Sequence, residues 1–210
     1  MSRRRQQQQL VDALSQSVRH FNRGELECLI KLFDRLVGKP DEHLAAIGFD
    51  RAKFREALHA TFGMTDDVIM DRVFRAFDRN NDSCINAVEW VEGIAIFLRG
   101  TMAEKMKYCF QVYDLNGDGH ISREEMFQLL KNSLCEPSSS EEDSDEGIKD
   151  LVDITVKKMD CDHDGKISFM DFEKAVGDEN LLLEAFGPCL PDIKSTMAFE
   201  KTIFGENLTL

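Results

Sequence analysis

The chain has 210 residues, which is enough for one large domain or two small ones, and its 26 basic and 39 acidic residues leave a formal net charge of −13. Such an acidic excess disfavours nonspecific binding to nucleic acid or anionic lipid. It suits a protein that concentrates cations or meets a basic partner.

The first 24 residues are basic and begin MSRRRQQQQL. We expect them to form an N-terminal helix or arm. They lack the apolar stretch of a secretory signal, and Ser2 stands where N-myristoylation needs Gly. No apolar run approaches membrane-spanning length, and the six cysteines form no CxxC pair and no zinc-type cluster. These features predict a cytoplasmic protein with reduced thiols, no membrane anchor and no nucleic-acid partner.

Residues 25–62 contain two predicted helices with no good metal loop between them. The first helix has apolar residues three or four apart, and the second begins after Asp50, a good N-cap residue. The segment from Gly38 to Phe49 contains Pro40 and few oxygen ligands at useful spacing. We interpret residues 26–62 as a metal-binding hand that has kept its helices and lost its metal.

Three 12-residue loops then follow, starting at Asp78, Asp114 and Asp160. Apolar residues at helical spacing flank each loop. Calcium takes six to eight oxygen ligands, and an EF-hand loop supplies them from positions 1, 3, 5, 7, 9 and 12. Position 7 contributes its backbone carbonyl, position 9 usually acts through water, and position 6 needs a positive φ and therefore Gly. The spacing predicts three EF-hand calcium sites.

The first loop, DRNNDSCINAVE, departs from this pattern at position 6, where Ser83 replaces Gly. Holding a non-Gly residue at positive φ costs about 1–2 kcal/mol, so we expect weaker binding here than at the second loop. Asn86 occupies position 9. The predicted ligands are Asp78, Asn80, Asp82, the carbonyl of Cys84, and Glu89.

The second loop, DLNGDGHISREE, meets every requirement of the pattern. Gly119 stands at position 6 and Ser122 at position 9. The predicted ligands are Asp114, Asn116, Asp118, the carbonyl of His120, and Glu125.

The third loop, DCDHDGKISFMD, ends in Asp171, which is one methylene shorter than Glu. Reaching the ion with both oxygens requires the loop to contract, and a smaller six-coordinate shell favours magnesium relative to calcium. We therefore predict that this site also takes Mg²⁺. The predicted ligands are Asp160, Asp162, Asp164, the carbonyl of Lys166, and Asp171.

The predicted fold is all-α, with two lobes of paired EF-hands. Each loop has Ile at its eighth position, and we expect Ile121 to pair with Ile167 in a short two-stranded ladder. Ile47 or Phe49 would make the matching contact to Ile85. The expected segments are an N-terminal lobe at 25–98, a junction at 99–102 with Gly100 ending a helix, a C-terminal lobe at 103–178 with a mobile acidic insert at 136–146, and a helical tail at 179–210.

Five methionines could line a target groove or pack between helices, and the pattern does not decide between these roles: Met102, Met106, Met126, Met159 and Met170. No hydrolase or transferase motif is present, so we expect no enzyme activity. A calcium sensor, a calcium buffer and a regulatory subunit of a phosphatase or other enzyme remain as alternatives.

Several segments that extend beyond the loops resemble the neuronal calcium sensor and calcineurin B group, in its branch from motile cilia and sperm flagella. They include CLIKLF from Cys28, TFGMTDDVIMDRVFRAFD ending at Asp78, EKMKYCFQVYDLNGDG ending at Gly119, and LLLEAFGPCLPD in the tail. The resemblance implies a calcium sensor located on the axoneme. Its implied partner is the outer-arm dynein heavy chain, with tubulin or the microtubule as a further candidate.

Overall fold

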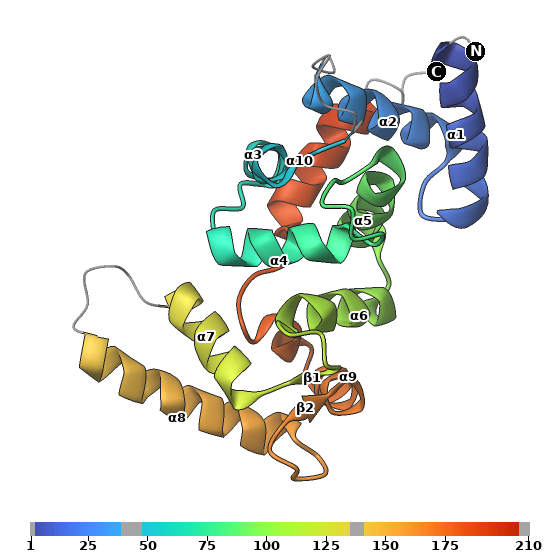
Figure 1. Ribbon diagram of the computed structural model, residues 1–210. Helices are drawn as coiled ribbons and strands as arrows, with labels where there is room; N and C mark the ends of the chain where they lie inside the picture. Colours follow the sequence, from blue (N-terminus) through green and yellow to red (C-terminus); the bar gives the residue numbers. More distant parts are fainter. Residues whose placement is uncertain (1–2, 39–47, 135–140, 206–210) are drawn as a thin grey trace. The chain divides into compact units, whose positions relative to one another are not determined.

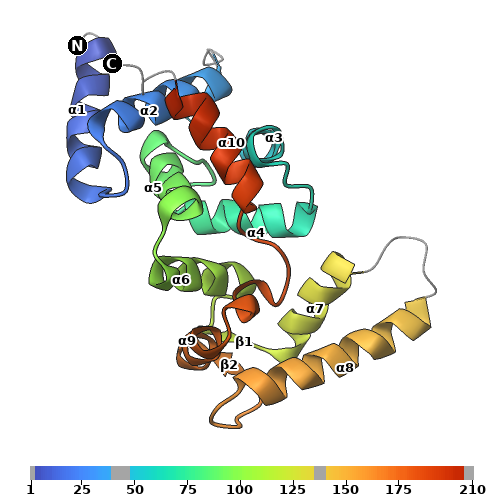
Figure 2. The same cartoon turned by 180° about the vertical axis from the view of Figure 1, so that it is seen from behind.

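The computed structural model describes residues 3–38, 48–134 and 141–205, and it confirms the all-α prediction for these residues. Figures 1 and 2 show the helices from opposite sides. No helix among these residues is both long and apolar enough to cross a membrane. The elements are α1 (Arg3–Ser17), α2 (Arg23–Val37), α3 (Arg51–Phe62), α4 (Asp67–Phe77), α5 (Ala87–Arg99), α6 (Met102–Tyr113), β1 (His120–Ile121), α7 (Arg123–Leu134), α8 (Glu141–Met159), β2 (Ile167–Ser168), α9 (Phe169–Asp178), η1 (Asn180–Glu184) and α10 (Ile193–Phe204).

Local sequence accounts for where several helices begin and end. Asp50 caps α3 by accepting a 2.8 Å hydrogen bond from the Lys53 N–H. Thr101 and Glu104 form a capping box at the start of α6. Gly100 follows the last residue of α5, as predicted. These caps satisfy backbone groups that have no partner inside the helix.

The chain divides into two compact units, and both are assembled from separate segments. Of the described residues, the first unit contains 3–38, 48–65, 77–100 and 191–205, and the second contains 66–76, 101–134 and 141–190. Two segments therefore group differently from the lobes expected on sequence. Most of α4 joins the second unit, and the tail is divided at residue 190.

Aromatic side chains form the core of the first unit. Phe49 contacts Phe33 and Trp90, with ring centroids 4.9 and 5.2 Å apart. Phe54 packs edge-on against Phe77 at 5.0 Å. All five side chains are buried. Aromatic pairs in such tilted arrangements stabilise a core beyond the area that they bury.

The last helix, α10, completes this unit by packing against α2, α3 and α5, as Figures 1 and 2 show. Its Phe199 stacks on Phe62, with centroids 5.0 Å apart and planes 20° apart. Arg99, at the end of α5, links α2 to α10. It donates hydrogen bonds to Glu25 at 2.8 Å and to Glu200 at 2.7 Å. The tail segment 191–205 is therefore part of the packed unit.

In the second unit, α6 pairs with α9 and α7 pairs with α8. The first part of the tail, including η1, packs against α6 and α9. Phe186 is fully buried and meets the Tyr113 ring edge-on at 5.2 Å, while the Tyr113 hydroxyl donates to the Gly187 carbonyl at 2.6 Å.

The predicted mobile insert at 136–146 is wrong for its second half, because α8 already begins at Glu141. Asp145 forms a 2.8 Å ion pair with Lys131 of α7. Acidic residues suit the N-terminal turns of a helix, because the helix dipole places positive charge there. Residues 135–140 lie outside the described part of the chain.

Candidate metal centres

The first loop joins α4 to α5 and folds around the Asp78 carboxylate. That carboxylate accepts hydrogen bonds from the N–H groups of Asp82 at 3.1 Å and Ser83 at 2.9 Å. Glu89, in the first turn of α5, reaches back to the N–H groups of Asn80 at 3.3 Å and Asn86 at 3.0 Å. The first and last predicted ligands therefore enclose the loop from both sides.

Ser83 has a φ of 65°, which confirms the positive φ expected at position 6. Asn81 in the same loop is also at positive φ, at 56°. Non-Gly residues are strained in this region of backbone space, although Asn tolerates it better than most. The first loop therefore adopts the conformation of an EF-hand loop with a local strain that a Gly at position 6 would not have.

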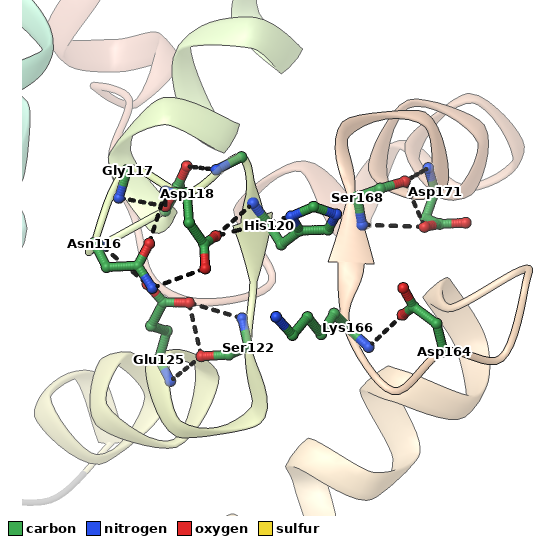
Figure 3. Close-up of polar contacts among 12 residues, drawn as sticks. Asn116, Gly117, Asp118, His120, Ser122, Glu125, Asp164, Lys166, Ser168 and Asp171 are labelled. Carbon is green, nitrogen blue, oxygen red and sulfur yellow. Dashed lines mark hydrogen bonds and ion pairs between the residues drawn. The ribbon is translucent and has the colours of Figure 1, made fainter.

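The second loop joins α6 to α7 and has the same hydrogen-bond pattern without that strain (Figure 3). The two oxygens of Asp114 accept from Gly117 at 2.7 Å and Gly119 at 2.8 Å. Glu125 accepts from the Asn116 N–H at 3.0 Å and from the Ser122 N–H at 2.7 Å. Gly119 has a φ of 84°, which costs a glycine little.

The third loop joins α8 to α9, with Gly165 at a φ of 88° at position 6 and His163 at a φ of 62° at position 4. Asp160 accepts from the N–H groups of His163 at 2.8 Å and Gly165 at 2.9 Å. The ligand oxygens of Asp160, Asp162 and Asp164 all lie within 4.8 Å of one another. Three carboxylates this close repel one another unless a cation lies between them.

Asp171 closes the third loop with the shorter side chain. One of its oxygens accepts from the Cys161 N–H at 3.2 Å. The other accepts from the Ser168 hydroxyl at 2.6 Å, as Figure 3 shows. Burial opposes ionisation, but these bonds and the one from the Ser168 N–H outweigh it and lower the pKa of Asp171. Asp171 is therefore ionised at neutral pH, as a metal ligand must be.

Position 7 of each loop folds over position 5 in the same way. The N–H groups of Cys84, His120 and Lys166 each donate a 2.8–2.9 Å hydrogen bond to the carboxylate two residues earlier. Figure 3 shows this for His120 on Asp118 and for Lys166 on Asp164. These are the residues expected to contribute backbone carbonyls.

The burial pattern fits a hard divalent cation. Among the described residues, the buried charged side chains are the first and last ligands of the three loops: Asp78, Glu89, Asp114, Glu125, Asp160 and Asp171. A buried carboxylate is costly unless it is paired or bound to a metal. An all-oxygen donor set with a carboxylate at each end is the chemistry that Ca²⁺ prefers.

The loops also pair through their eighth residues, as predicted. Ile121 of β1 lies opposite Ile167 of β2 in an antiparallel ladder. Phe49 and Ile85 exchange backbone hydrogen bonds of 2.9 and 2.8 Å, so Phe49 is the ladder partner of Ile85 in the hand that was predicted to have lost its metal. The neighbouring Gly48 leaves room for this approach, since a Cβ there would lie 2.4 Å from the Ile85 carbonyl oxygen. The alternative partner, Ile47, lies outside the described residues.

The five methionines differ in burial. Met106, Met126 and Met159 are buried, whereas Met102 and Met170 are 41% and 79% exposed. The cysteines described by the structure are free thiols. Cys109 and Cys189 are the nearest pair, with sulfurs 3.3 Å apart in a buried site where burial raises the pKa of Cys109.

Sequence reasoning missed two residues that hold the loops in place. Arg72 of α4 donates to the backbone carbonyl of Asp114, the first residue of the second loop, at 2.6 Å. Tyr113, directly before that residue, anchors the tail at Gly187. Each contact joins residues more than 40 positions apart, so the spacing of apolar residues within one helix could not reveal it.

Comparison with known proteins agrees with this geometry. An EF-hand domain-pair family matches residues 103–177, and with the loops described above it defines the chain as an EF-hand calcium-binding protein. Calaxin of Homo sapiens is 62% identical over 201 residues, covering 96% of this chain and 95% of the human protein. Calaxin of Danio rerio is 62% identical over 94% of this chain and 93% of its own length. The chain belongs to the calaxin family.

A more distant similarity links the chain to calcineurin. The calcineurin B subunit of Naegleria gruberi is 36% identical over 118 residues, covering 54% of this chain and 62% of that protein.

Proposed function

We propose that this protein is a calcium sensor that binds Ca²⁺ through three EF-hands and regulates axonemal outer-arm dynein, and through it ciliary and flagellar motility. The observation that carries the sensor role is the set of three loops in which two buried carboxylates enclose each predicted site. The dynein role rests on membership of the calaxin family and on the resemblance to EF-hand sensors of motile cilia. The proposed location is accordingly the cytoplasm and the axoneme.

Bound calcium supplies a double positive charge that offsets the mutual repulsion of the loop carboxylates. The chain's own contribution is to connect that charge to a helix. Glu125 lies in the first turn of α7 and already bonds to Asn116 and Ser122 of its loop. Any movement of this carboxylate therefore changes the direction of α7, which is how EF-hand sensors open.

We propose that the three sites differ in strength. The second loop has Gly at position 6 and Glu at position 12, so it binds calcium most tightly. The first loop carries the strain at Ser83. The third closes with Asp171, whose short side chain makes the site available to magnesium at resting calcium levels.

In each unit, a segment of the tail covers helices that would have to separate for the proposed groove to open. In the first unit α10 covers α2, α3 and α5 through the buried Phe199 and Phe204. In the second unit residues 180–190 cover α6 and α9 through the buried Phe186. A partner helix that enters an apolar groove must first displace these segments, so partner binding would compete with tail packing.

Two other functions make different predictions. A regulatory role on a phosphatase is favoured by the similarity to the calcineurin B subunit. A calcium buffer would fill the same loops and barely open. We propose that the protein is not catalytic under either alternative, because the carboxylates are concentrated in the metal loops.

Affinity capture from an extract of ciliated cells tests the choice of partner. The full-length protein is immobilised and exposed to extract with calcium or with chelator, and bound proteins are identified by mass spectrometry. We expect the outer-arm dynein heavy chain in greater yield with calcium. Recovery of a phosphatase without dynein would overturn the proposal. An apolar dye separates the buffer: fluorescence unchanged by calcium would contradict a sensor.

A further inference from the structure

Arg72 of the first EF-hand donates hydrogen bonds to the backbone of the second EF-hand, and these bonds are not part of the EF-hand loop pattern. It lies half-buried on α4, the helix that leads into the first loop. Its Nε donates to the carbonyl of Val112 at 3.2 Å, and its Nη2 donates to the carbonyl of Asp114 at 2.6 Å. All three residues belong to the second compact unit.

The two carbonyls lie at the C-terminal end of α6, where backbone acceptors have no partner within the helix. Cations stabilise this end of a helix, yet the last turn of α6 has no basic residue of its own. Arg72 supplies that charge from another helix. Burial and the nearby positive charge of Arg75 lower the pKa of Arg72, while attraction to the carboxylates of Asp114 and Glu125 opposes this shift.

Asp114 has two structural roles that meet at this contact. Its N–H donates to Phe110 at 2.9 Å and ends α6, while its carboxylate accepts from Gly117 and Gly119 and begins the second loop. The carbonyl held by Arg72 therefore belongs to the first predicted ligand of the second site. A displacement of Arg72 would move the backbone that carries this ligand.

The other end of α4 leads directly into the first site. The helix runs without interruption through Phe77, and the next residue is Asp78, the first predicted ligand of the first loop. Arg72 precedes Asp78 by six residues, which is less than two helical turns. One continuous helix thus leads into the start of one metal loop and makes a double hydrogen bond near the start of the next.

We propose that Arg72 is a positioning residue that couples the first two EF-hands, so that filling the Asp78–Glu89 loop changes the affinity of the Asp114–Glu125 loop. The inference rests on the proposed calcium binding by both loops. Closure of the first loop around its ion reorients α4, and Arg72 passes this change to the Val112 and Asp114 carbonyls. Thermodynamic linkage makes the effect reciprocal: the second loop must alter the first by the same factor.

Residue-resolved NMR can follow each loop separately in the full-length protein. The backbone N–H groups of Ser83, Gly119 and Gly165 each bond to the first carboxylate of their own loop, at 2.9, 2.8 and 2.9 Å. Their signals therefore report the first, second and third sites during a calcium titration. The substitution Glu89→Gln empties the first loop without touching Arg72.

The experiment is a double-mutant cycle read at the Gly119 signal. In the natural background, Glu89→Gln should change the calcium affinity of the second loop at least about five-fold, the lower end of typical allosteric coupling. In the Arg72→Met background, Glu89→Gln should change the calcium affinity of the second loop by less than about two-fold. Arg75→Met is the matched control, because Arg75 is an exposed arginine one turn further along α4. In the Arg75→Met background, Glu89→Gln should still change the calcium affinity of the second loop by at least about five-fold.

An ion-free measurement separates coupling from general damage. With chelator present, Arg72→Met should speed amide hydrogen exchange in the last turn of α6, and Arg75→Met should not. If Arg72→Met fails to fold, Arg72→Lys is measured by the same criteria, since lysine keeps the charge but lacks the planar pair of donors.

The coupling proposal is overturned if Glu89→Gln leaves the second loop unchanged in the natural background, or has an equal effect with and without Arg72. A Gly119 signal that does not respond to calcium at all would instead contradict the proposed metal site itself.

Discussion

The hydroxyl of Tyr113 donates a 2.6 Å hydrogen bond to the backbone carbonyl of Gly187, and both groups are buried. Tyr113 is the last residue of α6 and directly precedes the first predicted ligand of the second loop. Gly187 has a φ of 126°, in a turn of the tail after η1. The contact therefore ties the position of the tail to the start of a calcium loop.

Tyr113→Phe should release this part of the tail while keeping the aromatic packing against Phe186. The substitution leaves a buried carbonyl without its donor, which costs about 1–3 kcal/mol. We expect the ion-free protein to lose that much unfolding free energy in urea titrations and to be cut faster near residues 185–190 by limited proteolysis. Equal stability and equal proteolysis of the two proteins would show that this hydrogen bond does not retain the tail.

Ser83→Gly should strengthen calcium binding at the first loop. Ser83 is held at a φ of 65°, and relieving about 1 kcal/mol of strain in the ion-holding conformation corresponds to roughly a five-fold gain in affinity. The backbone amide signal at position 83, followed during a calcium titration of each protein, measures this gain. The reciprocal variant Gly119→Ser should weaken the second loop by a similar factor. A weaker first loop after Ser83→Gly would contradict the strain argument.

Asp171→Glu should shift the third loop from magnesium toward calcium. The added methylene allows both carboxylate oxygens to reach a larger ion without contraction of the loop. Calorimetric calcium titrations with and without magnesium should differ for the natural protein and converge for the variant. Glu125→Asp is the matched reverse change and should make the second loop sensitive to magnesium. Identical isotherms for the natural protein under the two conditions would refute the magnesium prediction.

Arg99→Gln should destabilise the first unit by about 1–2 kcal/mol at neutral pH, through loss of its bonds to Glu25 and Glu200. It also removes the Arg99 guanidinium from its place 5.1 Å from the Phe21 ring centroid. Burial of Glu25 opposes ionisation, but hydrogen bonds from Arg99 and the Asn22 N–H lower the pKa of Glu25 below its ordinary value.

The lowered pKa of Glu25 determines how the stability contributed by the Arg99 contact depends on pH. A carboxylate whose pKa is depressed by folding contributes its full stability above its unfolded pKa and loses it as the pH falls through the folded value. The stability difference between the natural protein and Arg99→Gln should therefore be constant above about pH 5 and shrink below the unfolded pKa of glutamate, about 4.3. Urea titrations from pH 7 to pH 3 measure it, with Arg23→Gln as the control, because Arg23 forms an exposed ion pair with Asp12. A difference that does not shrink would contradict the assignment.

The metal loops could be predicted from the sequence because their ligands lie within 12 consecutive residues. The same holds for the helix caps at Asp50 and Thr101, and for the ladder contacts of Phe49 and Ile121, which follow from the loop positions. In each case the physical requirement is local, so residue type and spacing express it directly.

The packing of the tail could not be predicted in this way. Phe199 stacks on Phe62, and Glu200 pairs with Arg99, across separations of more than 100 residues. The apolar residues on one face of a helix predict that another segment covers that face. They do not predict which segment, because any apolar surface of suitable size would fit. The acidic run before Asp145 was misread for a related reason: its composition suits either a solvated spacer or the first turns of a helix, and the pairing with Lys131 favours the helix.

The most direct test of the three-site account is a calorimetric calcium titration of the full-length protein and of three variants, Glu89→Gln, Glu125→Gln and Asp171→Asn. We predict three bound ions for the natural protein and the loss of one site in each variant, with Glu125→Gln reducing the calcium response more than Glu89→Gln. Fewer than three ions, or equal losses for Glu125→Gln and Glu89→Gln, would contradict the graded set of sites proposed for this protein.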